Sequence, residues 1–295
     1  MSFNLIVQRA EPLSMVDLAD LAVLVDAPTI EVLSDTAWRC LNANVEASVR
    51  EEVRELAAQL QCDWAFVEAG RDLSSFGLWM TDMDSTLIEI ECIDEIAALL
   101  GIKDQVAAIT ERSMAGELDF AESLTQRVAL LAGLKETSLR HVYDSKVTLT
   151  SGTETLVAAC KAAGVKIGLI SGGFTHFTDR LKAQLGLDYA IANTLEVKEG
   201  RLTGRLVGEI IDAQAKADWL IKLRDQLGLT AAQTFATGDG ANDLKMLEVA
   251  GVGIAFHAKP IVCHQADMAL SYVGLDGVDF TQSYPFIIKI FIFVL

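Results

Sequence analysis

The sequence predicts an α/β protein in which a small α+β domain precedes a Rossmann-like parallel sheet. Two observations support this fold class. Within residues 1–72, segments with strand character alternate with segments that have helical spacing, and after residue 73 short apolar strands alternate with helices. Apolar strands that alternate with helices indicate a parallel sheet with both faces covered. A mostly helical stretch, residues 89–150, interrupts the second pattern.

In the first 72 residues, the expected order is strand, helix, strand, strand, helix, strand. The segments are Phe3–Arg9, Leu13–Val25, Thr29–Leu33, Ala37–Leu41, Val45–Leu60 and Cys62–Val67. This order is that of a small ferredoxin-like sandwich. The segment after it, residues 71–75 (RDLSS), has the composition of a linker.

Further strands are expected in the second part of the chain. They are Gly77–Met80, Val165–Ile170, Thr234–Thr237 and Gly251–Phe256. Each of the first three is followed by an unusual cluster of polar residues or glycines. Because ligands of parallel α/β sheets bind at the carboxyl ends of the strands, these clusters are the candidate site.

Composition limits the classes of partner. The chain carries 24 Lys and Arg against 41 Asp and Glu, a net charge of −17. Without a basic surface we expect no nucleic-acid partner and no docking on an anionic membrane. No apolar run approaches the roughly 18 residues of a membrane span, and the start MSFNLIVQRAEP lacks a secretion-signal pattern. The five cysteines form no CxxC pair, so we expect reduced thiols in a cytoplasmic protein.

The first polar cluster, Asp82-Met83-Asp84-Ser85-Thr86, directly follows a strand. Side chains two residues apart on a strand share a face, so Asp82, Asp84 and Thr86 are expected to converge. Neighbouring carboxylates repel, and a proton or a metal cation must relieve them. This pattern suits one carboxylate as nucleophile and metal ligand and the other as general acid or base. A turn rich in Asp is the alternative interpretation.

Three other candidates lie further along the chain. The hydroxyl and glycine amides of Ser171-Gly172-Gly173 can form an anion-binding nest, or an ordinary strand-to-helix turn. Asp239, supported by Asp243, offers oxygen ligands that suit Mg²⁺, although a helix start also favours Asp or Asn. Lys216 lies at an expected helix start, where a solvated surface lysine is the alternative.

The order and spacing of these motifs resemble the haloacid-dehalogenase-like (HAD) phosphotransferases. The pattern is DxDxT after a strand, Ser at a strand end, Lys, and GDGxND after another strand. The contexts IEIECIDE around Glu91, FAESLTQRVALLAGL around Arg127, SGGFTHF and ATGDGANDLKML look like the bacterial phosphoserine phosphatase family. The resemblance covers roughly residues 78–278.

The resemblance implies a domain division. Residues 73–88 and 151–278 would form the HAD-like phosphatase core, and residues 89–150 a helical cap inserted into it. Residues 1–72 look like an ACT-type domain, which binds amino acids at interfaces. The resemblance ends near Gly277, and residues 279–295 (DFTQSYPFIIKIFIFVL) form an atypical apolar tail.

By this resemblance, Asp82 attacks phosphorus and forms an aspartyl-phosphate. Asp84 protonates the leaving seryl oxygen and then deprotonates the hydrolytic water. Mg²⁺ would be held by Asp82, the backbone carbonyl of Asp84, and Asp239, with Asp243 steadying the site. Because the phosphoryl group carries dispersed negative charge, catalysis of its transfer consists mainly of positioning and local positive potential.

The resemblance also assigns residues that bind the substrate. Ser171, the Gly172 amide and Lys216 would hold the phosphoryl oxygens, and Asn242 would contact the substrate or a nearby water.

Specificity for serine requires partners for an ammonium and a carboxylate. By the resemblance, Glu91 pairs with the substrate amine and Arg127 forks onto its carboxylate. From the residues alone, Glu91 is also an acid of a first helical turn, and the stem of Arg127 is suited to covering apolar surface. Met114 and Phe120 resemble positions where the cap lays an apolar lid over the substrate.

The resulting expectation is Mg²⁺-dependent hydrolysis of O-phospho-L-serine to L-serine and phosphate, the last step of serine biosynthesis. The partner is this small molecule, and a homodimer is the candidate assembly. One alternative is a HAD phosphotransferase that acts on a small alcohol such as homoserine. Another is a regulatory amino-acid-binding protein that uses the N-terminal domain.

The apolar tail has the composition of an aggregation-prone strand, with high β propensity and a single charge in residues 287–295. It could cover a sheet edge, mediate association, or reflect a sequence accident such as a shifted reading frame. The last two are favoured over a membrane anchor.

Overall fold

The computed structural model describes residues 1–278 and 288–291, and these residues divide between two units. The first unit combines Met1–Phe76, Ser151–Val165 and the chain from Ile254 onward. The second unit combines Gly77–Thr150 and Lys166–Gly253. The domain boundaries drawn from sequence character stay a prediction.

The N-terminal segment of the first unit contains the six elements that its residue pattern predicts. They are β1 (Phe3–Gln8), α1 (Met15–Leu24), β2 (Thr29–Ser34), β3 (Ala37–Cys40), α2 (Ala47–Leu60) and β4 (Asp63–Glu68). The strands pair antiparallel in the order β2-β3-β1-β4, which is the topology of a ferredoxin-like sandwich. Helix α1 begins at Ser14, whose hydroxyl accepts a hydrogen bond from the backbone N–H of Asp17.

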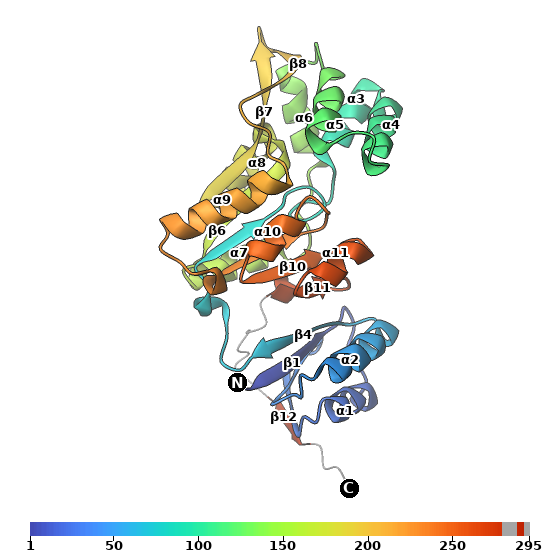
Figure 1. Ribbon diagram of the computed structural model, residues 1–295, viewed down its shortest axis with the longest axis vertical. Helices are drawn as coiled ribbons and strands as arrows, with labels where there is room; N and C mark the ends of the chain where they lie inside the picture. Colours follow the sequence, from blue (N-terminus) through green and yellow to red (C-terminus); the bar gives the residue numbers. More distant parts are fainter. Residues whose placement is uncertain (279–287, 292–295) are drawn as a thin grey trace. The chain divides into compact units, whose positions relative to one another are not determined.

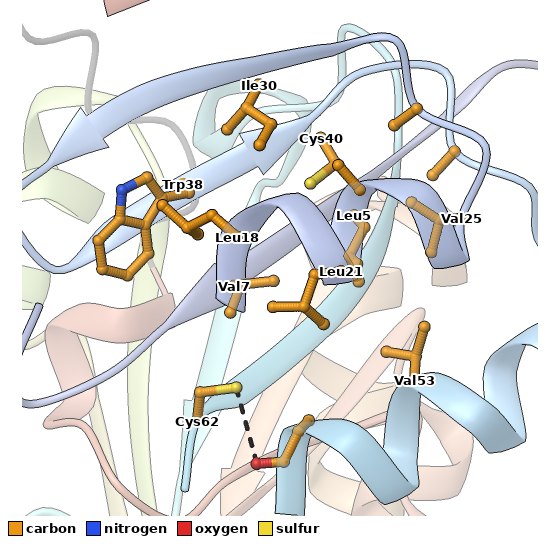
Figure 2. Close-up of a cluster of buried hydrophobic side chains, with 14 of the residues drawn as sticks. Leu5, Val7, Leu18, Leu21, Val25, Ile30, Trp38, Cys40, Val53 and Cys62 are labelled. Carbon is orange, nitrogen blue, oxygen red and sulfur yellow. Dashed lines mark hydrogen bonds between the residues drawn. The ribbon is translucent and has the colours of Figure 1, made fainter. Parts of the chain in front are cut away.

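One hydrophobic cluster lies between this sheet and its two helices. Alternate residues of β1, Leu5 and Val7, point toward Leu18 and Leu21 of α1 (Figure 2). The Cys62 thiol donates a hydrogen bond to the carbonyl oxygen of Ala57, the dashed line in Figure 2. The period-2 and period-3.6 apolar patterns of the sequence therefore meet in a single core.

The rest of the first unit extends this sheet. Its elements are η1 (Leu73–Ser75), α7 (Thr153–Ala162), β10 (Val252–Phe256), α11 (Pro260–Gln265), β11 (Met268–Leu270), η3 (Leu275–Val278) and β12 (Ile288–Phe291), and β10 starts in the second unit. Strand β11 pairs antiparallel with β4 through Ala269 and Trp64, and parallel with β10. The predicted linker contains the short helix η1, which begins at Asp72.

The carboxylate of Asp63 fastens β4 to the segment after β11. It is 4% exposed and accepts three backbone N–H bonds, from Ser271 at 2.7 Å, Tyr272 at 2.8 Å and Val273 at 3.0 Å. A buried carboxylate is stable only when such donors replace its lost water. Asp63 therefore connects two segments that lie more than 200 positions apart.

Part of the apolar tail is an edge strand. Strand β12 pairs antiparallel with β2, with Ile290 opposite Ile30. This pairing covers the outer edge of β2, which is one of the alternatives that the tail composition leaves open. The remaining tail residues, 279–287 and 292–295, lie outside the described residues.

The second unit is an α/β sheet with added helices (Figure 1). Its elements are β5 (Leu78–Thr81), α3 (Cys92–Leu100), α4 (Lys103–Met114), α5 (Phe120–Ala129), α6 (Glu136–Lys146), β6 (Lys166–Phe174), α8 (Thr175–Leu185), β7 (Tyr189–Lys198), β8 (Arg201–Val207), α9 (Ala213–Gln226), η2 (Ala231–Gln233), β9 (Thr234–Gly238) and α10 (Leu244–Val249). Strands β9, β5, β6 and β7 are parallel in that order, and β8 adds an antiparallel edge.

The stretch expected to be helical, residues 89–150, contains α3 to α6. Helix α4 contacts α3 and α5, and α3 also contacts α6. Helix α5 contacts β8 (Figure 1). No helix within residues 1–278 and 288–291 is long and apolar enough to cross a membrane.

Two features of the second unit differ from the expectation. Ser171–Gly173, expected to form a turn, continue strand β6, and the register with β7 shifts between Ile170 and Phe174. The hairpin of β7 and β8 was not expected. Its two-residue loop, Glu199-Gly200, has positive φ at both residues (51° and 72°), the geometry of the tight hairpin turn that Asn-Gly usually signals.

We predict that Asp63→Ala lowers the free energy of unfolding by about 3 kcal/mol, because three backbone N–H groups lose their acceptor. Urea-induced unfolding followed by circular dichroism measures this loss. Asp63→Asn, which keeps one acceptor oxygen, should fall between Asp63→Ala and wild type. The exposed Asp20→Ala is the matched control, and an equal effect of both alanine variants would contradict the assignment.

Candidate active site

Sheet pairing positions the first candidate nucleophile. Thr81, the last residue of β5, is in register with Thr237 of β9 on one side and Leu169 of β6 on the other. The next residue, Asp82, continues the ladder by donating its N–H to the Thr237 carbonyl oxygen at 3.0 Å. The carboxyl ends of three parallel strands thus meet at Asp82, which is 4% exposed.

A buried lysine lies behind Asp82. Lys216, on the first turn of α9, has no exposed surface, and its Nζ lies 2.8 Å from Asp82 Oδ1 and 2.7 Å from Asp243 Oδ1. Asp212 caps the N-terminus of helix α9, and its side chain accepts the Ala215 N–H. Burial opposes the charge of Lys216, but the carboxylates of Asp243 and Asp82 outweigh it and raise its pKa.

The loop after β9 folds back over its own strand. Asp243 accepts the Gly240 N–H on Oδ2 and Lys216 Nζ on Oδ1, so both of its oxygens are used. A Cβ at Gly238 would lie 2.5 Å from Asp243 Cγ, and one at Gly240 would lie 2.1 Å from Asn242 Oδ1. This close approach therefore requires glycine at position 238, whereas at Gly240 only the end of the Asn242 side chain would have to move.

Carboxylates outnumber cations around Lys216. Oxygens of Asp82, Asp239 and Asp243 all lie within 4.8 Å of one another. Burial, and then the Asp243 charge, raise the pKa of Asp82 well above its usual range. The same two causes raise the pKa of Asp239 to about 6, although Thr86 Oγ1 donates to its Oδ1 at 3.2 Å. Such a cluster of oxygen ligands can hold a divalent cation.

Asp84 lies on the turn after β5. Its Oδ1 accepts the backbone N–H of Cys92 at 3.3 Å, and a Cβ on Gly173 would lie 3.1 Å from its Oδ2. Burial and then the nearby Glu91 charge raise the pKa of Asp84 to about 7. A carboxyl group in this range can both donate and accept a proton near neutral pH.

These groups surround one cavity of about 130 Å³. The lining residues are Asp82, Asp84, Glu91, Ile93, Phe120, Leu124, Arg127, Ser171, Gly172, Gly173, Phe174, Asp239 and Asn242. The cavity combines acidic and basic groups with the apolar side chains of helices α3 and α5. Its chemistry therefore suits a small, charged ligand with a short carbon skeleton.

The groups expected to select the substrate come from the helical stretch. Glu91 is the residue before α3, and its Oε1 accepts a hydrogen bond from Ser85 Oγ at 2.8 Å. Ser85 has a φ of +54°, so the turn that follows Asp84 is unusual for a non-glycine residue. Arg127 lies on α5, and its Nε donates to the Ser123 carbonyl oxygen at 3.4 Å. Both side chains reach the cavity.

The structure brings the predicted site residues together. Eight of them line the cavity, and they are Asp82, Asp84, Glu91, Arg127, Ser171, Gly172, Asp239 and Asn242. Lys216 contacts Asp82 from behind. Phe120 lines the cavity, whereas Met114 is 70% exposed and does not. The roles of these residues stay predictions.

The residue pattern missed two neighbours of the site. Ser85 orients Glu91, and Cys92 supplies the N–H bonded to Asp84. Ser85 stands inside the DMDST motif, so its position was a signal that could have been used. Cys92 carried no such signal, because its contribution comes from the backbone.

Comparison with known proteins agrees with this geometry. Residues 80–248 match the model of the haloacid dehalogenase-like hydrolase family. A phosphoserine phosphatase from Vibrio cholerae is 46% identical over 236 residues, covering 80% of this chain and 72% of that protein. The chain belongs to the phosphoserine phosphatase family of haloacid dehalogenase-like hydrolases. Residues 5–53 match a domain of unknown function, DUF4072.

Solved structures share this fold. A haloacid dehalogenase family hydrolase from Salmonella enterica serovar Typhi superposes with a TM-score of 0.88 at 34% identity, covering 97% of this chain and all of that one. A phosphoserine phosphatase solved as an analogue of its phospho-aspartyl intermediate superposes with a TM-score of 0.65 at 40% identity. That match covers 69% of this chain and 97% of the other.

We predict that Gly238→Ala lowers kcat at least tenfold, because the added methyl group displaces Asp243 and with it Lys216. Steady-state kinetics measures the loss. Gly228→Ala, at a turn with open space around its Cβ position, is a control for a glycine that makes no close approach, although its positive φ costs some stability. Retention of full activity in a folded Gly238→Ala would contradict the packing argument.

Proposed function

We propose that the protein hydrolyses O-phospho-L-serine to L-serine and phosphate through an aspartyl-phosphate on Asp82, with Mg²⁺ as cofactor, as the last step of serine biosynthesis. One observation carries the proposal. A single small cavity holds paired aspartates, Ser171 and Gly172 at the end of β6, and the oppositely charged Glu91 and Arg127. Membership of the phosphoserine phosphatase family supports the same reaction.

The donor set fits a divalent cation. Among the described residues of the site, five carboxylates, those of Asp82, Asp84, Glu91, Asp239 and Asp243, stand against two cationic side chains, Lys216 and Arg127. Burial, and then the Asp243 charge, raise the pKa of both Asp82 and Asp239. Asp82 uses Oδ1 for both Lys216 and the Met83 N–H. The Asp82 carboxylate, Asp239 and the Asp84 backbone carbonyl would hold Mg²⁺, which would supply positive charge to the phosphoryl oxygens.

Asp82 is suited to attack on phosphorus. Asp82 lines the cavity, and Lys216 and the Met83 N–H both contact Oδ1, so neither of them engages the second carboxylate oxygen. Attack by that oxygen forms the bond to phosphorus as the bond to the seryl oxygen breaks. The Ser171 hydroxyl and the Gly172 amide would stabilise the equatorial phosphoryl oxygens.

Asp84 is suited to the proton transfers. It would protonate the seryl oxygen as that oxygen leaves, and then accept a proton from the water that cleaves the aspartyl-phosphate. Its pKa of about 7 allows both states to be populated near neutral pH. The Cys92 N–H holds Oδ1, so the second oxygen is the one available for proton transfer.

Glu91 and Arg127 are suited to an amino acid. Glu91 would pair with the substrate ammonium and Arg127 with its carboxylate in a bidentate arrangement. Phe120 and Leu124 of α5 would exclude water from the substrate carbon atoms that lie between the charged groups. A homodimer, a cytoplasmic location, and amino-acid binding by the N-terminal segment stay predictions.

We expect phosphate release from phosphoserine to require Mg²⁺ and to fall by at least a factor of about 10³ in Asp82→Asn, which lacks a charged nucleophile. A colorimetric phosphate assay with and without chelator measures both effects. Asp104→Asn, an exposed change of the same type on α4, should leave the rate unchanged. Adding homoserine and analysing products separates hydrolysis from transfer, and phosphohomoserine as the main product would refute hydrolysis.

Arg127→Ala should lower kcat/KM for phosphoserine about 100-fold but change that for phosphoethanolamine, which lacks the carboxylate, by less than about threefold. Competition between the two substrates measures this difference. The exposed Arg140→Ala on α6 is the matched control. Equal losses for both substrates would show that Arg127 does not read the carboxylate.

A further inference from the structure

The side chain of Asn193, on β7, joins two segments of the site. It is 1% exposed, and both of its polar atoms are bonded. Its Nδ2 donates to the Gly172 carbonyl oxygen at 2.8 Å, and its Oδ1 accepts the Ile211 N–H at 2.9 Å. A buried amide that satisfies two backbone groups of different segments restrains both.

The first bond replaces a missing step of the sheet ladder. Strands β6 and β7 pair regularly up to Ile170 and resume at Phe174, which is opposite Asn193. Between these positions the backbone of Ser171–Gly173 departs from the regular register. The Asn193 amide donates to Gly172 where the ladder is interrupted.

This bond also orients the Ser171 hydroxyl. The Gly172 carbonyl and the Gly173 N–H belong to one planar trans peptide and point in opposite directions. The Gly173 N–H donates to Ser171 Oγ at 2.8 Å. The Gly172–Gly173 peptide is therefore bonded to Asn193 through its carbonyl and to Ser171 through its N–H. Because Ser171 Oγ accepts this bond, its own O–H remains able to donate to a phosphoryl oxygen.

The second bond reaches the segment that carries Lys216. Ile211 directly precedes Asp212, which caps the N-terminus of α9, and Lys216 lies on the first turn of that helix. Lys216 in turn fixes Asp82. One side chain on β7 therefore connects the start of α9 with the Ser171–Gly173 segment of β6.

We infer that Asn193 is a positioning residue for the phosphoryl subsite: through the Gly172–Gly173 peptide it aims the Ser171 hydroxyl, and through Ile211 it keeps α9 in register with that hydroxyl. The inference rests on the proposed function, in which this subsite holds the phosphoryl group. The groups that hold the serine moiety, Glu91 and Arg127, are not connected to Asn193 by these bonds. The effect of Asn193 should therefore be confined to phosphate.

The test compares Asn193→Asp with wild-type full-length protein in Mg²⁺. Aspartate keeps an acceptor for the Ile211 N–H but loses the donor to Gly172. We expect the inhibition constant of inorganic phosphate to rise about tenfold and kcat/KM for phosphoserine to fall by a similar or larger factor. The inhibition constant of L-serine should change by less than about twofold.

A double-mutant cycle with Ser171→Ala tests whether Asn193 acts through Ser171. If it does, Asn193→Asp should raise the phosphate inhibition constant, and lower kcat/KM for phosphoserine, by much smaller factors in the Ser171→Ala background than in wild type. Additive losses, equal weakening of phosphate and serine, or an unchanged phosphate inhibition constant in a folded variant would each overturn the inference. Asn42→Asp, an exposed change of the same charge in the N-terminal segment, is the matched control and should behave as wild type.

A second variant guards against misfolding. Serine at position 193 keeps a hydroxyl that can donate and accept, on a shorter side chain. If Asn193→Asp does not fold, Asn193→Ser is measured in its place and the same outcomes are expected. Binding of inorganic phosphate and of L-serine is also measured by calorimetry, which needs no turnover. Absence of phosphoserine turnover in wild type would refute the proposed function, whereas wild-type phosphate binding by folded Asn193 variants would refute only the inference.

Discussion

The candidate site depends on one ammonium group that is removed from water. Lys216 Nζ lies between Asp82 and Asp243 with no exposed surface, and a lone buried charge would be strongly destabilising. The two carboxylates come from the end of β5 and from the loop after β9, so the ion pairs can form only when α9 packs against both. The ion pairs of the candidate site and the packing of α9 against the end of β5 and the loop after β9 therefore depend on each other.

The same arrangement supports the proposal that the site holds a further cation. Lys216 brings one positive charge to the two carboxylates that it contacts, and Asp239 and Asp84 lie nearby. Burial, and then the charges of Asp243 and Glu91 respectively, raise their pKa values to about 6 and 7. A phosphoryl dianion would add to this repulsion. The proposed Mg²⁺ at Asp82 and Asp239 would offset this repulsion and would favour the ionised form of Asp82.

Much of the site could be predicted because its residues stand at strand ends, where short apolar runs and the motifs that follow them are visible in the sequence. The β7–β8 hairpin was missed because its turn is Glu199-Gly200, a weaker signal than Asn-Gly. The role of Asn193 could not be predicted, since it depends on a register shift between β6 and β7 that no local pattern encodes. Lys216 was expected to bind the phosphoryl oxygens. Its bonds to Asp82 and Asp243 could not be predicted, because they form only when α9 packs against the segments that carry these two residues.

Chemistry and selectivity are placed on different segments and meet at one turn. Asp82 and Asp84 follow β5, whereas Glu91 precedes α3 and belongs to the stretch expected to form the cap. Ser85, immediately after Asp84, adopts a positive φ and donates to Glu91. The turn that holds Asp84, the proposed proton-transfer group, therefore also holds the carboxylate proposed to bind the ammonium. Because the Glu91 charge also raises the Asp84 pKa, a substrate ammonium that pairs with Glu91 would weaken that influence. In the proposed mechanism, amino-acid binding at Glu91 would therefore influence proton transfer by Asp84.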